Sequence, residues 1–251
     1  RTQAQARRES LENLRTELSR LEARRESLEQ IVAHRAYTTE TVKNLFAAID
    51  QGRLGDFRAK GILADFIDVD AAYERAVEEF LREELEYVVV EDWDAAERGL
   101  SLLRAEMEGH ATFLVPPEGG AGPEVARLGP EAGVLGRLGD HVRMPAGLGP
   151  ANSLLPRLAR CYLVKDAEEA RRLARRYPEL YFLLRDGACY HGYSLSGGRK
   201  SSSGPLALKR ELRELGPRLA AGAKELDTET AAVAALEKTI TAESAELEAL
   251  R

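Results

Sequence analysis

Apolar residues at the two ends of the chain recur in alternating steps of three and four, with glutamate and arginine between them. The first series contains Leu11, Leu14, Leu18, Leu21, Leu28 and Val32, with Arg25 in its one gap. The second contains Leu212, Leu215, Leu219, Leu226, Val233, Leu236, Ile240, Leu247 and Leu250, with Gly222, Glu229 and Glu243 at its imperfect positions. A repeat of about 3.5 residues over several heptads is typical of a coiled coil. We therefore predict helices over residues 1–37 and 205–251 that pair antiparallel within one chain. The alternative is one amphipathic helix packed on the core at each end, which the polar flanks disfavour.

The middle of the chain, residues 38–204, alternates short apolar runs with helical patterns. The runs GILADFIDV and YVVVED predict strands on either side of a helix from Asp70 to about Leu85. One face of that helix carries Tyr73, Ala76, Val77, Phe80 and Leu81. Asp92 or Asp94 is expected to cap the next helix, which Gly109 ends before another strand.

The later part of this region repeats the same order of elements. CYLVKDAEEARRLARRYPELYFLL predicts a strand, a helix capped by Asp166 with Glu169 three residues on, and a second strand. A Pro- and Gly-rich linker, about 116–133, separates the two similar parts. The predicted fold class is α/β (α+β): two similar subdomains, about 38–118 and 125–204, flanked by the coiled coil.

Composition narrows the function classes. The 251 residues are 44% apolar and 31% charged, with a formal net charge of −6. This charge disfavours a surface that coats nucleic acid throughout, but it permits a local basic patch. Cys161 and Cys189 lack ligand spacing and are expected to be buried thiols in a reducing compartment. No apolar run approaches the ~20 residues that a membrane span needs. Because the chain starts at Arg1 without a signal peptide, we expect an internal piece of a longer protein.

The stretch YHGYSLSGGRKSSSGPLALKREL contains glycines followed by lysine and serine, as phosphate-binding loops do. The spacing of these residues, however, differs from that of a P-loop. Lys200 precedes Ser201, but Gly197 and Gly198 are adjacent and the P-loop glycine spacing is absent. Pro205 also falls before the helix resumes, whereas a phosphate cradle leads directly into a helix N-terminus. We therefore expect no nucleotide site in this chain.

Metal and catalytic sites are likewise not predicted. His34, His110, His141 and His191 are scattered, without a second ligand at metal-binding spacing. A triad of Ser196, His191 and Asp186 is conceivable, but no nucleophile elbow surrounds the serine. A hairpin turn at Asp186-Gly187 explains those two residues without catalysis.

The glycines and cations of the same stretch have two interpretations each. Gly192, Gly197 and Gly198 lie in or just after a strand, where close approach of a second chain at a sheet edge favours small residues. A flexible connection to the coil is the alternative. Arg199, Lys200, Lys209, Arg210 and Arg213 form a basic cluster. Such a cluster binds DNA phosphates in a salt-dependent, sequence-independent way, and a solvated helix start is the alternative.

The segments GILADFIDVDAAYERAVEEFLREELEYVVVEDWDAA, GHATFLVP, GRLGDHVRM and FLLRDGACYHGYSLSGG occur in that order within the heptad flanks. This ordered set resembles the hinge of a bacterial structural maintenance of chromosomes (SMC) protein. Arg82-Glu83 departs from the family pattern, because relatives commonly have a glycine-containing turn there.

The resemblance implies a hinge that dimerises into a small ring by joining sheet edges at two contacts. It implies interface roles for Gly187, Gly192, Gly197 and Gly198. It also implies weak, non-sequence-specific DNA contact near the coil junction through Arg199, Lys200, Lys209 and Arg210. ATP and Mg²⁺ would bind heads outside this fragment, which itself would need no cofactor and hydrolyse nothing. The longer protein would act in chromosome condensation and segregation, in the cytoplasm at the nucleoid, without a membrane partner.

Other functions remain open on the sequence alone. A monomeric coiled-coil scaffold whose α/β tip binds a protein or small ligand would have the same elements, with its glycines in a mobile loop. A related DNA-repair ATPase with a zinc hook would need an apical C-x-x-C, which the sequence lacks. An enzyme is the third alternative, and it would depend on His191 or Ser196.

Overall fold

The computed structural model describes residues 2–117, 127–198 and 204–250. The chain divides into two compact units, each described separately below. The first unit contains Arg1–His34 and Leu208–Arg251, and the second contains Arg35–Ala207. Within the described residues, no helix combines the length and apolar character that crossing a bilayer requires.

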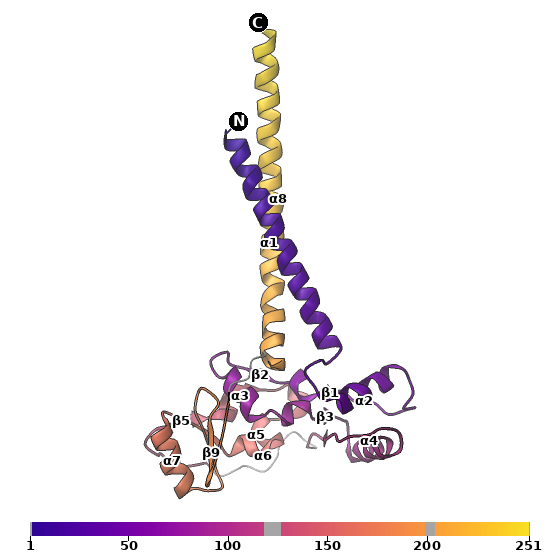
Figure 1. Cartoon of the computed structure of the whole chain (residues 1–251), viewed down its shortest axis with the longest axis vertical. Helices are drawn as coiled ribbons and strands as arrows, with labels where there is room; N and C mark the ends of the chain where they lie inside the picture. Colours follow the sequence, from indigo (N-terminus) through magenta and orange to yellow (C-terminus); the bar gives the residue numbers. More distant parts are fainter. Residues whose placement is uncertain (1, 118–126, 199–203, 251) are drawn as a thin grey trace. The chain divides into compact units, whose positions relative to one another are not determined.

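The first unit is an antiparallel pair of long helices. Helix α1 (Thr2–Ala33) and helix α8 (Pro205–Ala249) lie side by side, as Figure 1 shows. Among the described residues, ion pairs connect them at Arg7–Glu229 (2.9 Å), Arg8–Glu237 (2.6 Å) and Arg24–Glu211 (2.7 Å). Arg7 and Arg8, early in α1, meet residues far along α8, whereas Arg24, later in α1, meets Glu211 near the start of α8, so the two helices run in opposite directions. The predicted intramolecular coiled coil is confirmed.

The heptad positions form the contact between these helices. Leu11, Leu18 and Leu28 of α1 are buried, as are Leu215, Leu219 and Val233 of α8. Gly222 occupies an apolar position of the repeat without a side chain of its own. A Cβ there would lie 2.5 Å from Leu18 Cδ2, so the Leu18 side chain takes the space that an alanine methyl would need.

The second unit contains two sheets of related construction. The smaller has the order β1-β3-β4, with β1 (Gly61–Ile62) antiparallel to β3 (Val88–Val89) and β4 (Phe113–Leu114) parallel to β3. Helix α4 (Trp93–Glu106) connects the parallel pair, as a parallel connection requires. Asp92 accepts a hydrogen bond from the Ala95 amide at 2.7 Å, which confirms it as the cap of α4.

The larger sheet has the order β10-β9-β8-β7-β5. Its strands are β5 (Val134–Arg137), β7 (Cys161–Val164), β8 (Tyr181–Leu183), β9 (Cys189–His191) and β10 (Ser194–Ser196). Helix α7 (Ala167–Arg176) connects the parallel strands β7 and β8, with Asp166 as its cap. Because β5 is antiparallel to β7, this sheet repeats the β1-β3-β4 arrangement and adds the hairpin β9–β10. The two predicted strand-helix-strand modules of similar construction are therefore present.

A third, two-stranded sheet joins the two halves. Strand β2 (Asp68–Val69) pairs antiparallel with β6 (Val142–Arg143). The remaining helices of the unit are α2 (Glu40–Asp50), α3 (Glu74–Phe80), α5 (Ala151–Leu154) and α6 (Pro156–Ala159). Short 3₁₀ turns cover Leu63–Asp65, Glu84–Glu86, Leu138–His141 and Ala146–Leu148.

Two predicted elements differ from the structure. The single strand expected over GILADFIDV is split into β1 and β2, because the Asp65 carboxylate accepts the Ile62 amide at 3.0 Å and closes a 3₁₀ turn. The helix expected from Asp70 to about Leu85 is shorter at both ends, since α3 spans Glu74–Phe80 and a separate 3₁₀ turn covers Glu84–Glu86. Its start is delayed because the Asp70 carboxylate binds Arg143 and His141 instead of capping it.

One apolar core extends through both halves of the unit. It includes Val88 and Val89 of the smaller sheet together with Cys161, Leu163 and Leu183 of the larger. Tyr162 and Val164, on the other face of β7, pack with α7 in a second cluster. Strand β7 is thus buried on both faces, which explains its uninterrupted apolar sequence.

Candidate protein interface at the β10 edge

Strand β10 is the outermost strand of the larger sheet, and it exposes apolar side chains. Ser194, Leu195 and Ser196 are all exposed, with Leu195 at 62%. Tyr193, in the turn before β10, is 97% exposed. An exposed sheet edge with adjacent apolar side chains is a template for pairing with another chain.

The first two candidate glycines shape the hairpin that carries this edge. Gly187 has φ +94° in the turn between β8 and β9, where its amide donates to Leu184 O at 3.0 Å. Gly192 has φ +54° in the turn between β9 and β10. Both conformations disfavour residues with a Cβ. The predicted hairpin turn at Asp186-Gly187 is confirmed, since Leu183 pairs with Cys189 across it.

The other two candidate glycines follow β10. A Cβ on Gly197 would lie 3.1 Å from Ala188 Cα, so the absence of a side chain allows the two backbones to approach closely. Among the described residues, a Cβ on Gly198 would have no neighbour within 4 Å. Contacts and turns within the chain itself therefore account for Gly187 between β8 and β9, and for Gly192 and Gly197 around β9 and β10.

A groove of about 380 Å³ lies beside the hairpin. Its walls include Glu79, Phe80 and Arg82 from the α3 region, together with Arg157, Tyr181 and residues of β9 and β10. The Arg157 guanidinium lies 4.8 Å from the Phe80 ring centre and 5.4 Å from the Tyr181 ring centre. Arg157 also forms an ion pair with the buried Glu84.

An aromatic stack supports the underside of β9. The Tyr181 and His191 rings are parallel, with centroids 4.0 Å apart and an interplanar angle of 12°. Phe80 meets Tyr181 edge-on at 5.3 Å. His191 Nδ1 lies 3.1 Å from Leu180 O, which fixes the ring on the neighbouring strand. These contacts hold the hairpin in place from the core side and leave its outer edge exposed.

The structure does not support a catalytic triad of Ser196, His191 and Asp186, because these residues have other contacts. The Asp186 carboxylate accepts the Ala188 amide at 3.0 Å within the turn, and His191 is committed to Leu180 and Tyr181. Ser196 lies on the exposed edge strand and pairs with Cys189 rather than with His191. The described part of the chain also contains no group of three or more histidine, cysteine, aspartate or glutamate side chains placed to hold a metal ion.

Both cysteines are buried and free, as the sequence predicted. Burial raises the pKa of Cys189 to about 11 and the pKa of Cys161 well above its usual value. Strand β8 lies between β7 and β9, so the two cysteine backbones are separated by two strand spacings, about 9.5 Å. A disulfide needs Cα atoms within roughly 7 Å. The thiols therefore serve as apolar core groups.

A second sheet edge is available on the other half of the unit. Strand β4 ends the smaller sheet, and residues 111–117 around it are half-buried. The opposite edge strand, β1, is fully buried. The Val88 and Val90 amides donate to the Thr112 and Leu114 carbonyls, so the main-chain groups of the intervening Phe113 face away from β3.

The predicted DNA-binding cations are only partly described. Arg199 and Lys200 lie outside the described residues. Lys209 and Arg210 lie on α8 in the coiled-coil unit, where Arg210 forms a 3.9 Å ion pair with Glu214. Whether the four cations form one patch therefore remains a prediction.

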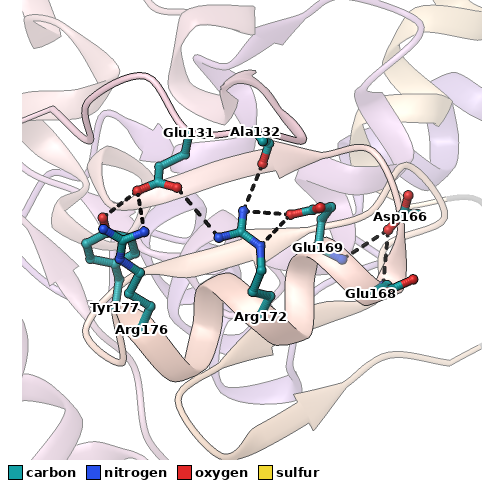
Figure 2. Close-up of polar contacts among 8 residues, drawn as sticks. All are labelled: Glu131, Ala132, Asp166, Glu168, Glu169, Arg172, Arg176 and Tyr177. Carbon is teal, nitrogen blue, oxygen red and sulfur yellow. Dashed lines mark hydrogen bonds and ion pairs between the residues drawn. The ribbon is translucent and has the colours of Figure 1, made fainter.

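The segment before β5 is anchored to α7 by the Glu131 carboxylate (Figure 2). Tyr177 Oη donates to Glu131 Oε1 at 2.6 Å, and Arg176 Nη1 lies 3.2 Å from the same oxygen. Arg172 lies 3.7 Å from Glu131 Oε2 and donates to the Ala132 carbonyl at 3.1 Å. The C-terminal end of the predicted linker is therefore fixed to the second half.

Sequence reasoning did not identify Tyr193, Leu195 or Arg157. The alternation of Tyr193 and Leu195 is a weak signal, since any strand carries apolar residues two apart. Their exposure follows from the position of β10 at the sheet edge. The role of Arg157 depends on Glu84, which is 73 residues away in the chain.

Comparison with known proteins shows which family this chain is similar to. The family model for the SMC proteins flexible hinge domain matches residues 58–174. The chromosome partition protein Smc of Koribacter versatilis is 39% identical over 212 residues, covering 82% of this chain and 16% of that protein. The Smc of Myxococcus xanthus is 31% identical over 216 residues, covering 82% and 17% respectively. The chain thus spans about a sixth of these relatives.

Solved structures show the same fold. An asymmetric dimer of the Geobacillus stearothermophilus SMC hinge domain matches with a TM-score of 0.77 at 22% identity, covering 96% of this chain and 97% of that one. The Pyrococcus furiosus Smc hinge domain with an extended coiled coil matches with a TM-score of 0.51 at 24% identity, covering 98% and 90%.

Proposed function

The middle of this chain is an SMC hinge domain flanked by a coiled coil, and we propose that it joins two copies of a chromosome partition protein through their sheet edges. The observation that carries this proposal is the β10 edge, with exposed Leu195 and Tyr193 on a hairpin that the core holds firmly.

The pairing that best fits the available edges is β10 of one copy with β4 of the other. Of the two edges of the smaller sheet, β1 is buried, whereas β4 is half-buried and directs the Phe113 main chain outwards. A two-fold axis between the copies then produces two equal contacts and a closed ring. The second contact forms within a complex already joined by the first, so the dimer is far tighter than one contact alone.

We further propose that the hinge contacts DNA without sequence preference through cations that follow β10 in the chain, both before α8 and in its first turns. Lys209 and Arg210, together with Arg199 and Lys200 outside the described residues, are the candidates. The relatives that this chain resembles are named chromosome partition proteins, which supports DNA as the charged partner. Lysine and arginine neutralise phosphates and release counterions, so this binding weakens steeply with salt.

The longer protein is proposed to be an ATPase of chromosome condensation and segregation, in the cytoplasm at the nucleoid. ATP and Mg²⁺ would bind its heads, beyond the sixth of the relatives that this chain spans. The hinge itself would use no cofactor.

The test of the central proposal is the mass of the chain in solution, measured by light scattering over a thousandfold concentration range. The expected mass is twice the 27.7 kDa of one chain, persisting on dilution. A mass of 27.7 kDa at every concentration would overturn the hinge function and favour the monomeric scaffold, whose tip binds a different protein or a small ligand.

A further inference from the structure

Three consecutive residues of the short helix α3 contact three different parts of the second unit. Glu78 binds the first turn of α8, Glu79 lies against the turn at Gly187, and Phe80 packs with Arg157 and Tyr181. Successive side chains of a helix project about 100° apart, so neighbouring residues of the seven-residue α3 can contact three different parts of the unit.

Glu78 acts as an external cap for α8. The Leu206 and Ala207 amides both donate to Glu78 Oε1, at 2.7 and 3.1 Å. These amides belong to the first turn of α8, which begins at Pro205 and has no preceding carbonyls to bind them. The negative carboxylate is also favourable at the positive end of the helix dipole.

The residue before α8 is adapted to this contact. A Cβ on Gly204 would lie 2.4 Å from Glu78 Oε1 and 2.5 Å from Glu78 Cδ. Any larger residue would therefore push the carboxylate away from the α8 amides. Leu206 is itself buried and belongs to the core that contains α3, so the first turn of α8 is held by packing and by the carboxylate together.

Glu79 connects the same helix to the β9–β10 hairpin. Its side chain is only 10% exposed, because Arg82 covers its carboxylate at 2.6 Å. The Glu79 Cγ and Cβ lie 3.0 and 3.1 Å from the place where a Gly187 Cβ would be. The turn that leads into β9 thus rests directly on α3, one residue from the cap of α8.

We propose that Glu78 is a positioning residue that couples the β10 edge to the first turn of α8 through α3. The proposal rests on the proposed function, since it gives the edge contact a consequence at the start of the coiled-coil helix. When a partner strand pairs with β10, it restricts the motion of the β9–β10 hairpin and of the Gly187 turn that leads into β9. Through the Glu79 contact, α3 then moves less. The Glu78 carboxylate on α3 therefore keeps its hydrogen bonds to the Leu206 and Ala207 amides for a larger fraction of the time. Coupling of this kind is reciprocal, so loosening the α8 cap also weakens dimerisation slightly.

The experiment is amide hydrogen exchange at Leu206 and Ala207, resolved by NMR, in dimeric and monomeric chains. The parent chain provides the dimer, and Leu195→Asp on the exposed edge strand, made in the parent and in each variant below, provides the monomer. Dimerisation is expected to slow exchange of these two amides at least tenfold in the parent. Glu78→Ala should abolish that slowing while the β9 amides remain protected by dimerisation.

Two further variants distinguish the coupling through Glu78 from a general loss of stability or of surface charge. Glu78→Gln keeps an amide oxygen that can accept the same hydrogen bonds, and it should restore part of the slowing. Glu83→Ala removes an equal charge from an exposed position outside the α8 contact, and it should behave as the parent.

The outcomes distinguish the coupling from the function on which it rests. A chain that dimerises without slowing exchange at Leu206 and Ala207 would overturn the coupling and leave the hinge function intact. Equal slowing in Glu78→Ala and the parent would also overturn it. A chain that never dimerises would overturn the hinge function itself, and the coupling with it.

Discussion

The Arg157 guanidinium lies 4.8 Å from the centre of the Phe80 ring, and this contact joins the two halves of the α/β unit. Arg157 belongs to α6, after the linker, whereas Phe80 ends α3, before it. The same guanidinium donates to the Phe80 carbonyl at 3.3 Å and pairs with the Glu84 carboxylate. Glu84 is only 4% exposed, so Arg157 provides the counter-charge for a buried carboxylate next to the candidate interface.

Arg157→Ala is expected to destabilise the unit by about 2 kcal/mol, because it leaves Glu84 buried without its partner. Adding Glu84→Gln should recover part of that loss, since a neutral amide is less unfavourable in an apolar site than a charge. Urea denaturation of the three proteins measures both effects. Arg160→Ala, which removes an exposed arginine from the residue after α6, is the matched control. Equal destabilisation by the control would show that the Glu84 contact is not the cause.

Tyr193→Ser combined with Leu195→Asp is expected to weaken self-association at least a hundredfold. The pair removes the two exposed apolar side chains of the edge and places a charge against the incoming strand. Light scattering on dilution measures the dissociation constant, and circular dichroism checks the fold. The control is Leu135→Asp, on the opposite edge strand β5, where Leu135 is 51% exposed. Loss of the dimer in the control alone would move the interface to β5.

The sequence predicted those elements that depend on residues close together in the chain. The heptads identified the coiled coil: six of their positions are buried between α1 and α8, although Leu247 and Leu250 at the end of α8 are exposed. Asp166, and either Asp92 or Asp94, were predicted as caps because a carboxylate before an amphipathic run binds the first free amides; Asp92 and Asp166 are the caps. The hairpin at Asp186-Gly187 followed from its turn residues in the same way.

The features that escaped prediction depend on residues far apart in the chain. Asp70 was expected at the start of a helix, but it meets Arg143, which is 73 residues later. The pairing of β2 with β6 has no local signal at all. The candidate interface combines both kinds of feature. Its glycines were predicted from the sequence, whereas the exposure of β10 and the packing of Arg157 against Phe80 and Tyr181 could be recognised only from the three-dimensional structure.

Charge reversal of Arg199 and Lys200 to glutamate is expected to weaken binding of a 30-base-pair duplex and to flatten its salt dependence. Loss of two phosphate contacts should reduce the slope of log K against log salt by about 2. Fluorescence anisotropy at several salt concentrations measures the slope, and the dimer mass should not change. Arg171→Glu with Arg175→Glu makes the same charge change at exposed positions of α7. An equal effect from both pairs would mean that overall charge, not a local patch, governs DNA binding.

The Glu131 cluster gives the unit a component of stability that acid removes. Hydrogen bonding from Tyr177, with the charges of Arg176 and Arg172, lowers the pKa of Glu131 below its ordinary value of 4.5. A carboxyl group whose pKa is lower in the folded state stabilises the fold above its unfolded pKa and loses that contribution as pH falls through the folded pKa. Glu131→Gln should therefore lower the melting temperature at pH 7, and its difference from the parent should shrink as pH falls below about 4.5.

Thermal unfolding followed by circular dichroism from pH 7 to pH 3 checks this pH dependence. Glu179→Gln, at an exposed position just beyond α7, is the control and should follow the parent throughout. A difference between Glu131→Gln and the parent that stays constant down to pH 3 would show that packing, and not the charge of Glu131, fixes this segment to α7. Loss of the difference only at low pH would show that the carboxylate itself anchors the chain on the way into β5.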